Sequence, residues 1–276
     1  MSASILTQYE MGLGAKSPCT RALAHTVLSE FLAQAGSPPW SVSTIAMYLT
    51  RLISSANAGS TISTKMMVLR VFMRWASSAG YADAECVPMC CAPKYPQPVP
   101  RTATADEIDL LLNTAGPRLR MPLLLAVHLG IRESEIRGLT WGALDLEVGQ
   151  ATIIGKGSKL RVVPIVDESL LEYLREKRGE SSQYLVPGEC GRMLTRGVFG
   201  KRLRLHCREL GIRELTPHSF RHAFASGWHK RGLAAREVQA LLGHSSLVTT
   251  EHYLSALTGT ESLRASMMQH REERLA

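Results

Sequence analysis

The sequence predicts a mainly α-helical protein: an all-α N-terminal unit followed by a mixed α+β domain with a small antiparallel β-hairpin or sheet. Apolar residues recur with a helical period through most of the chain, and β-like runs occur only around residues 151–166. Between the two parts, four prolines fall within residues 93–100. Alternate prolines hold a chain extended and prevent helix and sheet hydrogen bonding, so these residues predict a linker.

The composition is that of a globular protein with a moderate basic bias. The 276 residues include 32 Lys and Arg against 24 Asp and Glu, a net charge of +8. This bias favours a polyanionic partner such as nucleic acid without requiring one. No apolar run reaches the length of a membrane span and the N-terminus lacks the pattern of a signal peptide, so we expect no membrane association and a cytoplasmic location. The six cysteines form no disulfide framework, and reduced thiols are expected, with metal binding by the 86–91 cluster as the weaker alternative.

The N-terminal domain is expected to span residues 1–92. Residues 1–16 are polar and contain glycine, which predicts a loosely held arm. Helical periodicity then predicts helices over about 18–35, 41–54 and 61–78. The third of these carries Lys65, Arg70 and Arg74 on its polar side. These three cations form either a solvated helix face or a DNA-facing surface.

The second domain is expected to follow the 93–101 linker and to span residues 102–276. Thr104 and Glu107 form a capping-box pattern at the start of a helix. Residues 119–129 predict a buried helix that is closed by Gly130, and Arg132 follows this glycine directly.

Two β-like runs, 151–154 and 160–166, predict a hairpin whose glycine-rich turn carries Lys156 and Lys159. The turn is not a phosphate-binding P-loop, because the leading glycine of that motif is missing and a strand follows where a helix is needed. Further helices are expected over about 167–178 and 195–210, the latter rich in arginine.

A helix is predicted to begin with Thr216 as its N-cap and Pro217 in its first turn. An apolar stripe anchors this helix, while His218 and Arg221 lie on a different flank. His218 and His222 do not form a zinc site of the H-E-x-x-H type, because Ser219 replaces the glutamate. We therefore expect no metal ligands here.

Six residues form the candidate catalytic set: Arg132, Lys156, His218, Arg221, His244 and Tyr253. Each alone is read most simply as a surface or core residue. Together they supply two permanent cations for a phosphate, a lysine that can protonate a leaving oxygen, histidines for proton transfer and a hydroxyl nucleophile. No acidic cluster suited to Mg²⁺ accompanies them. The combination indicates metal-free attack by a tyrosine on a phosphodiester.

The motifs H-S-F-R and L-L-G-H, with Tyr253 after them, L-G-I-R-E-S-E-I upstream and I-G-K-G-S-K-L-R-V-V-P between, resemble those of the tyrosine recombinase (phage integrase) family. The resemblance covers nearly the whole chain and implies a core-DNA-binding domain followed by a catalytic domain. Because about 16 residues precede the first predicted helix, it favours a compact, Xer-like or simple integrase layout without an arm-binding domain.

The resemblance implies a role for each residue of the candidate set. Tyr253 would attack a DNA phosphate to form a 3′-phosphotyrosyl link, while Arg132 and Arg221 hold that phosphate. Lys156 would protonate the leaving 5′-oxygen. His218 would exchange a proton with Tyr253, and His244 would hydrogen-bond the phosphate. Glu135 matches an acidic position that supports the site, with a plain surface carboxylate as the alternative.

The implied function is site-specific DNA recombination through a Holliday junction, without metal, ATP or another cofactor. The expected partners are double-stranded recombination sites, further copies of the chain in a homotetramer joined by the tail 254–276, and accessory proteins. The expected location is the nucleoid, and Lys65, Arg70, Arg74 and Lys159 are the expected DNA-binding residues outside the catalytic set. Two alternatives remain: a type IB topoisomerase with the same chemistry, and a DNA-binding regulator that has lost catalysis.

Overall fold

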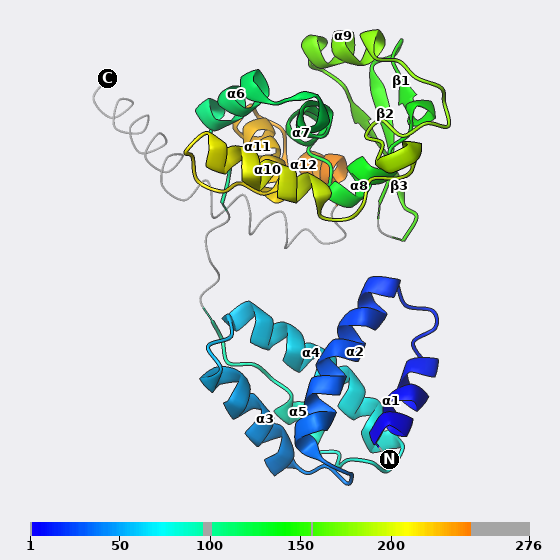
Figure 1. Cartoon of the computed structure of the whole chain (residues 1–276), viewed down its shortest axis with the longest axis vertical. Helices are drawn as coiled ribbons and strands as arrows, with labels where there is room; N and C mark the ends of the chain where they lie inside the picture. The colour runs from blue at the N-terminus through cyan, green and yellow to red at the C-terminus, as the bar shows by residue number, and fades with distance from the viewer. Residues whose placement is uncertain (1, 96–100, 156, 244–276) are drawn as a thin grey trace, which may run out of the picture. The chain divides into compact units, whose positions relative to one another are not determined.

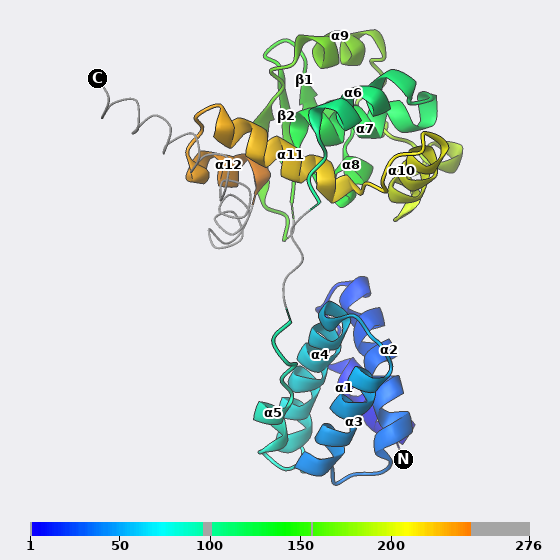
Figure 2. The ribbon, with the colours of Figure 1, turned by 90° about the vertical axis from the view of Figure 1, so that its left-hand side faces the viewer.

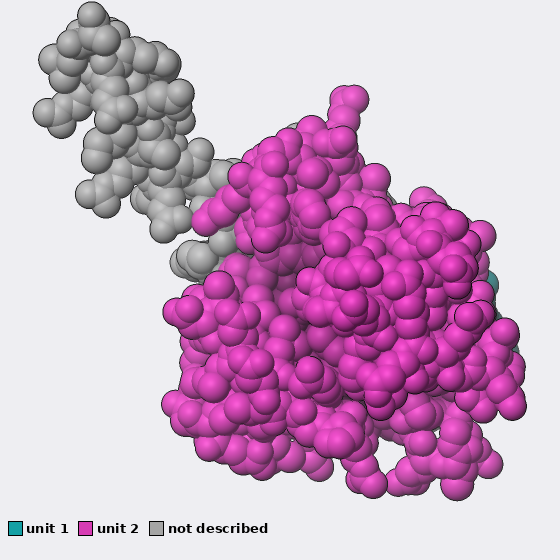
Figure 3. Space-filling model, turned by 90° about the horizontal axis from the view of Figure 1, so that it is seen from above, with its two compact units in different colours: residues 1–98 teal, residues 99–276 magenta. Residues whose placement is uncertain are grey.

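The computed structural model describes residues 2–95, 101–155 and 157–243 (Figure 1). Backbone contacts divide the chain into two units, residues 1–98 and 99–276, which Figure 3 colours separately. Each unit has its own hydrophobic core. The described part contains no helix long and apolar enough to cross a membrane. None of the six cysteines forms a disulfide.

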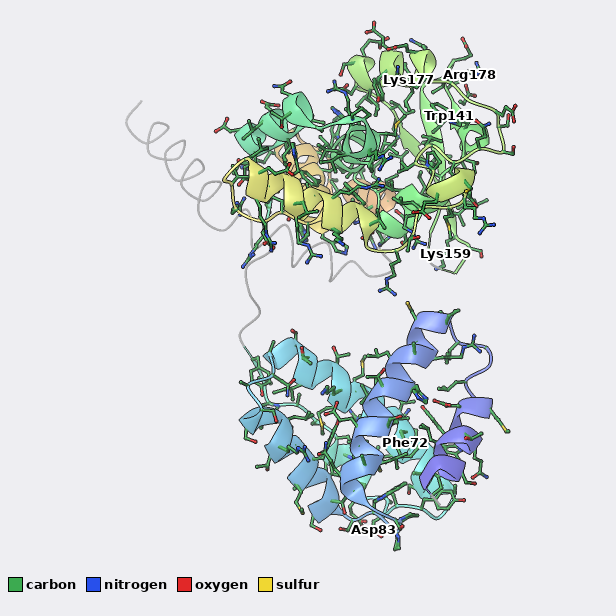
Figure 4. All side chains as sticks on the ribbon, viewed as in Figure 1. Phe72, Asp83, Trp141, Lys159, Lys177 and Arg178 are labelled. Atoms are coloured by element: carbon green, nitrogen blue, oxygen red, sulfur yellow. The ribbon has the colours of Figure 1, made fainter. Side chains whose placement is uncertain are left out.

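The first unit is all-α, as predicted, with helices at each of the three expected places. Its core is aromatic: Phe72 is fully buried, and its ring centroid lies 5.6 Å from that of Trp40 and 6.4 Å from that of Phe31 (Figure 4). The helices are α1 (Ser2–Met11), α2 (Pro18–Ala35), α3 (Val42–Ser54), α4 (Gly59–Ser78) and α5 (Cys86–Met89).

The prediction that residues 1–16 form a loosely held arm is wrong. Residues 2–11 form helix α1, and Ile5, Leu6 and Tyr9 are buried on one side of it. The Tyr9 ring meets Phe72 edge-on, with the ring centroids 5.1 Å apart. These apolar residues have the spacing of a helix face, but the polar and glycine residues around them hid the pattern at the level of composition.

The second unit consists of helices around a small sheet. Helix α7 lies at its centre and contacts α6, α8, α10 and α11, which explains why α7 is apolar almost all round (Figures 1 and 2). The helices are α6 (Ala105–Thr114), α7 (Pro117–Leu129), α8 (Glu133–Gly138), α9 (Glu168–Glu176), α10 (Val198–Glu209), α11 (Pro217–Lys230) and α12 (Ala235–Leu242), with short 3₁₀ turns at Trp141–Ala143 and Glu189–Gly191.

The sheet has the order β1-β2-β3 and is antiparallel throughout: β1 (Leu144–Asp145), β2 (Gln150–Ile154) and β3 (Leu160–Pro164). The predicted hairpin is confirmed, with Ile154 opposite Leu160 next to the turn. Strand β1 was not predicted, because two residues are too few to show an alternating pattern. Helix α9 follows β3, so the β2–β3 turn lies at the other end of the sheet (Figure 1).

Candidate active site

Helix α11 begins as the sequence predicts. Thr216 is its N-cap and Pro217 occupies the first turn, while the Thr216 N–H donates to Oγ of Ser219 at 3.2 Å. Phe220 is fully buried and anchors the helix in the core of the second unit. This anchoring fixes the direction of the next side chain, that of Arg221, which points inward and is only 4% exposed.

Arg221 joins two other segments of the unit. Its Nη1 donates to the Gly130 carbonyl oxygen at 2.7 Å, and its Nη2 donates to the Leu242 carbonyl oxygen at 2.5 Å. Gly130 ends α7 in the left-handed conformation (φ 60°), and a Cβ there would lie 2.5 Å from the Phe224 ring. Glycine is therefore needed both for the turn and for the close approach of α11.

Arg132 is the N-cap residue of α8, and its side chain reaches the Leu242 carbonyl that Arg221 also binds. Its backbone N–H donates to Glu135 Oε2 at 2.8 Å, and its Nη1 donates to Glu135 Oε1 at 2.9 Å. Nη1 and Nη2 also donate, each at 3.3 Å, to the carbonyl oxygens of Leu242 and Gly243. The Arg132 side chain is 28% exposed, so part of its guanidinium faces solvent.

Glu135 is buried, with a side chain that is 4% exposed, and two arginines share it. Arg161 of β3 donates from Nη1 to Oε1 at 2.9 Å and from Nη2 to Oε2 at 2.8 Å. Burial by itself would raise the pKa of Glu135, but the hydrogen bonds from Arg161 and Arg132 and their charges lower this pKa below its ordinary value. Glu135 is thus a buried carboxylate that stays ionised.

Arg161 is a site residue that the sequence analysis missed. The alternation of β3 carried the signal: Val163 and Ile165 face the core, and Arg161 falls on the same side of the strand. A charged residue at an inward strand position needs an ionic partner, because an unpaired charge is costly to bury. The sequence did not show that this partner is Glu135, which lies on another element.

The C-terminal end of α12 is the point where these side chains meet. Gly243 ends the helix in the left-handed conformation (φ 63°, ψ 45°). Arg161 Nε donates to the Leu241 carbonyl oxygen at 2.8 Å, next to the carbonyls that Arg132 and Arg221 bind. The last carbonyls of a helix lack partners within it and carry the negative end of its dipole, so three guanidiniums fit there.

His218 and His222 lie one turn apart on α11, with ring centroids 6.3 Å apart. Burial, reinforced by the charges of Arg221 and Arg132, lowers the pKa of His218 below its ordinary value of 6.5. Burial, reinforced by His218 and by the charge of Arg221, lowers the pKa of His222 to about 4. Both imidazoles are therefore neutral at pH 7 and have a nitrogen that can accept a proton.

The β2–β3 turn begins beside Glu135. We call Arg132, Glu135, Arg161 and Arg221, which meet at the end of α12, the arginine cluster, or the cluster for short. A Cβ added at Gly155 would lie 3.5 Å from Arg161 Nη1 and 3.6 Å from Glu135 Oε1, so the backbone of residue 155 borders this cluster. Lys156 itself, His244, Tyr253 and the tail 254–276 lie outside the described residues. Lys159 is exposed on the turn (Figure 4).

The structure thus brings together Arg132, Glu135, His218 and Arg221 of the predicted site. In the part of the chain that it describes, no group of three or more His, Cys, Asp or Glu side chains is placed to hold a metal ion.

The predicted DNA-binding residues of the first unit differ in their surroundings. Arg70 and Arg74 are exposed on α4. Lys65 on the same helix pairs with Glu30 of α2 at 2.6 Å, and its side chain is 18% exposed. The assignment of these residues to DNA binding stays a prediction, with less of the Lys65 charge available to a partner.

Residues 101–259 match the model of the phage integrase family. The tyrosine recombinase XerD of Pseudomonas aeruginosa is 34% identical over 200 residues, which cover 67% of this chain and 67% of that protein. XerD of Yersinia pestis is 36% identical over 197 residues, covering 65% of this chain and 64% of that protein. The matched stretch is thus about two thirds of the length of these relatives.

Two solved structures share the fold at low sequence identity. Lambda integrase residues 75–356 bound to DNA superpose with a TM-score of 0.76 at 20% identity, covering 94% of this chain and 97% of that chain. A lambda integrase tetramer bound to a Holliday junction gives a TM-score of 0.70 at 19% identity, covering 88% of this chain and 77% of that chain. The mainly helical fold with a small antiparallel sheet is therefore that of lambda integrase.

Proposed function

Because the chain belongs to the phage integrase family, we propose that it is a site-specific DNA recombinase that cuts and rejoins strands through Tyr253. The observation that carries the proposal is the convergence of Arg132 and Arg221 at the end of α12, with the buried, ionised Glu135 behind Arg132. Relatives named tyrosine recombinase, 34% and 36% identical to this chain, support it.

The two arginines would bind the scissile phosphate. A phosphodiester under attack gains negative charge, so guanidiniums that are already oriented stabilise the transition state more than the ground state. Protein carbonyls and Glu135 fix both guanidiniums before DNA arrives, which removes the cost of orienting them during the reaction. A metal ion is not needed for charge neutralisation in this scheme.

The proton transfers would follow from the remaining residues. Tyr253 Oη attacks phosphorus and passes its proton to the neutral imidazole of His218, while the bond from phosphorus to the 5′-oxygen breaks. Lys156 gives a proton to this leaving oxygen and His244 donates a hydrogen bond to the phosphate. In the reverse step, a 5′-hydroxyl of another strand attacks the phosphotyrosyl bond. This bond keeps the energy of the broken linkage, so no ATP is consumed.

The proposed partners are double-stranded DNA sites and further copies of the chain. Lambda integrase forms a tetramer on a Holliday junction, and this fold is shared by the chain, which supports a homotetramer that exchanges strands in two rounds. The tail 254–276 would join neighbouring copies. Accessory proteins would assist the reaction, and the protein would act at the nucleoid. Arg70, Arg74, Lys159 and Lys65 are the proposed contacts to DNA outside the catalytic set.

The test requires a DNA site, which can be selected from a random duplex library by binding to the purified chain. A nick next to the cleavage position traps the covalent intermediate. The short fragment that carries the freed 5′-hydroxyl diffuses away, so the strand cannot be rejoined. Wild type should form a covalent adduct with and without EDTA, and Tyr253→Phe should form none. Tyr184→Phe is the matched control, since Tyr184 lies in the same unit, and this variant should behave as wild type.

The same reagents separate the two alternatives. A type IB topoisomerase would relax supercoiled plasmid that lacks the selected site, whereas a recombinase should act on the site and produce a Holliday junction between two copies of it. A regulator without catalysis would bind the site and form no adduct. The absence of an adduct with wild type would overturn the proposed function.

A further inference from the structure

Arg161 makes more contacts with the cluster than a surface arginine would. It donates to both oxygens of Glu135 and to the Leu241 carbonyl oxygen, at 2.8 to 2.9 Å, and its side chain is 10% exposed. It thereby joins three elements, β3, α8 and α12. Arg161 is not one of the six proposed catalytic residues.

We propose that Arg161 is a positioning residue for strand cleavage: it holds Glu135 against Arg132 and cancels the Glu135 charge that would otherwise repel the phosphate. This inference rests on the proposed function, in which Arg132 binds the scissile phosphate.

Charge is the first argument. The Arg132–Glu135 pair is neutral by itself, and its carboxylate lies 2.9 Å from Nη1 of the arginine that must attract an anion. With Arg161 included, two cations and one anion leave a net charge of +1. The site has little water to screen this charge, because Glu135 is 4% exposed and Arg161 10% exposed. Arg161 thus allows Glu135 to orient Arg132 without neutralising its attraction for phosphate.

Geometry is the second argument. A carboxylate bound by the two-pronged guanidinium of Arg161 cannot rotate, so the Oε1 that accepts from Arg132 stays in place. The same guanidinium binds the end of α12 through Leu241, one residue before the carbonyl shared by Arg132 and Arg221. Gly155, across the hairpin, borders Glu135 and Arg161. Arg161 therefore fixes the helix end, the carboxylate and the start of the turn together.

The chain provides a matched control in Arg213. Arg213 also donates to both oxygens of one glutamate, Glu107, and to one backbone carbonyl, that of Thr102, but at the start of α6. Changing either arginine to lysine keeps the charge and removes the two-pronged bond, which a lysine cannot form. The two variants should both lose stability, and only the one in the cluster should lose activity beyond that.

The first experiment uses the full-length protein and its selected DNA site. Site binding, thermal unfolding and the rate of adduct formation at saturating enzyme are measured for wild type, Arg161→Lys and Arg213→Lys, well below the unfolding temperature. Arg161→Lys should bind the site nearly as wild type and form the adduct about 10- to 100-fold more slowly, as expected for misplaced reacting groups. Arg213→Lys should cleave at the wild-type rate.

The second experiment tests the charge argument. Arg161→Met leaves the Arg132–Glu135 pair with no net charge to attract phosphate, so its adduct rate should fall below that of Arg161→Lys. Adding Glu135→Gln restores the net charge of +1, and the double variant should cleave faster than Arg161→Met alone. A double variant no faster than the single one would refute charge cancellation.

The remaining outcomes are also decisive. If wild type forms no adduct, the proposed function fails and this inference fails with it. If wild type cleaves and Arg161→Lys cleaves at the same rate, only the role of Arg161 is overturned. Equal losses of cleavage in Arg161→Lys and Arg213→Lys would reduce Arg161 to a structural residue.

Discussion

Arg132 and Arg221 donate to the same acceptor, the carbonyl oxygen of Leu242, at 3.3 and 2.5 Å. Arg132 comes from the start of α8 and Arg221 from α11, so the end of α12 sets the distance between the two guanidiniums. A single backbone oxygen with two lone pairs can serve both donors. The phosphate-binding pair is therefore organised by the main chain of a third element, and changes at any of the three should affect the other two.

Arg221→Lys should cost both stability and cleavage. A lysine cannot reach the Gly130 and Leu242 carbonyls together, and a buried acceptor left unpaired costs about 1–3 kcal/mol in the free energy of unfolding. Loss of one oriented donor should slow adduct formation by about 100-fold or more. Denaturant unfolding and single-turnover cleavage measure the two effects.

The control for this variant is Arg202→Lys on α10. Arg202 donates to a single carbonyl, that of Arg118, at 3.1 Å. Arg202→Lys should lose little stability and should cleave at the wild-type rate. An Arg221→Lys protein that cleaves at the wild-type rate would remove Arg221 from the proposed phosphate site.

Gly130→Ala should destabilise the second unit. The new Cβ would lie 2.5 Å from Phe224 at a left-handed backbone position, and overpacking and strain of this kind each cost about 1–3 kcal/mol. Gly138→Ala is the matched control, because a Cβ there meets nothing within 4 Å. Thermal unfolding of the two variants decides, and equal melting temperatures would show that the α7–α11 contact adapts at no cost.

Stability should fall as the pH is lowered from about 6.5 towards 4, and His222 should contribute to the fall. Its pKa is about 4 in the folded chain against an ordinary 6.5, so the unfolded chain binds more protons in this window. The contribution is fully present above pH 6.5 and is lost as the pH approaches 4. The lowered pKa values of His218 and Glu135 act in the same direction at low pH.

The measurement is the free energy of unfolding against pH for wild type and His222→Asn, and the variant should show a shallower slope between pH 6.5 and 4. Ser226→Ala, one turn further along α11, removes no titratable group and should keep the wild-type slope. An unchanged slope in His222→Asn would mean that this imidazole is protonated as easily in the folded chain as in the unfolded one.

The proposed DNA contacts of α4 should separate into two kinds. Arg70→Gln and Arg74→Gln, both at exposed positions, should each reduce the slope of log K against log salt by about 0.9, one phosphate contact apiece. Lys65→Met should change this slope less and should lower the melting temperature, because it breaks the pair with Glu30. Binding titrations at several salt concentrations test this, and a full unit of slope lost in Lys65→Met would make Lys65 a phosphate contact after all.

The local structure of the site was readable from the sequence because local interactions decide it. Thr216 and Pro217 start α11 and Gly130 ends α7, each as predicted. The alternation of β2 and β3 gave the hairpin, and the ordered motifs gave the family. Helix α1 was not predicted, because its few apolar residues are a weak pattern by themselves. They are buried only because they pack against the aromatic core around Phe72.

Capping, glycine turns and periodicity act over a few residues, so they predict from the sequence alone which residue types lie on which helix, turn or strand. The contacts that those residues make depend on the tertiary fold. The common acceptor of Arg132 and Arg221 at Leu242, and the sharing of Glu135 between Arg132 and Arg161, join elements that are distant in the chain. Such long-range hydrogen bonds depend on how the helices pack around α7, and no local pattern encodes them.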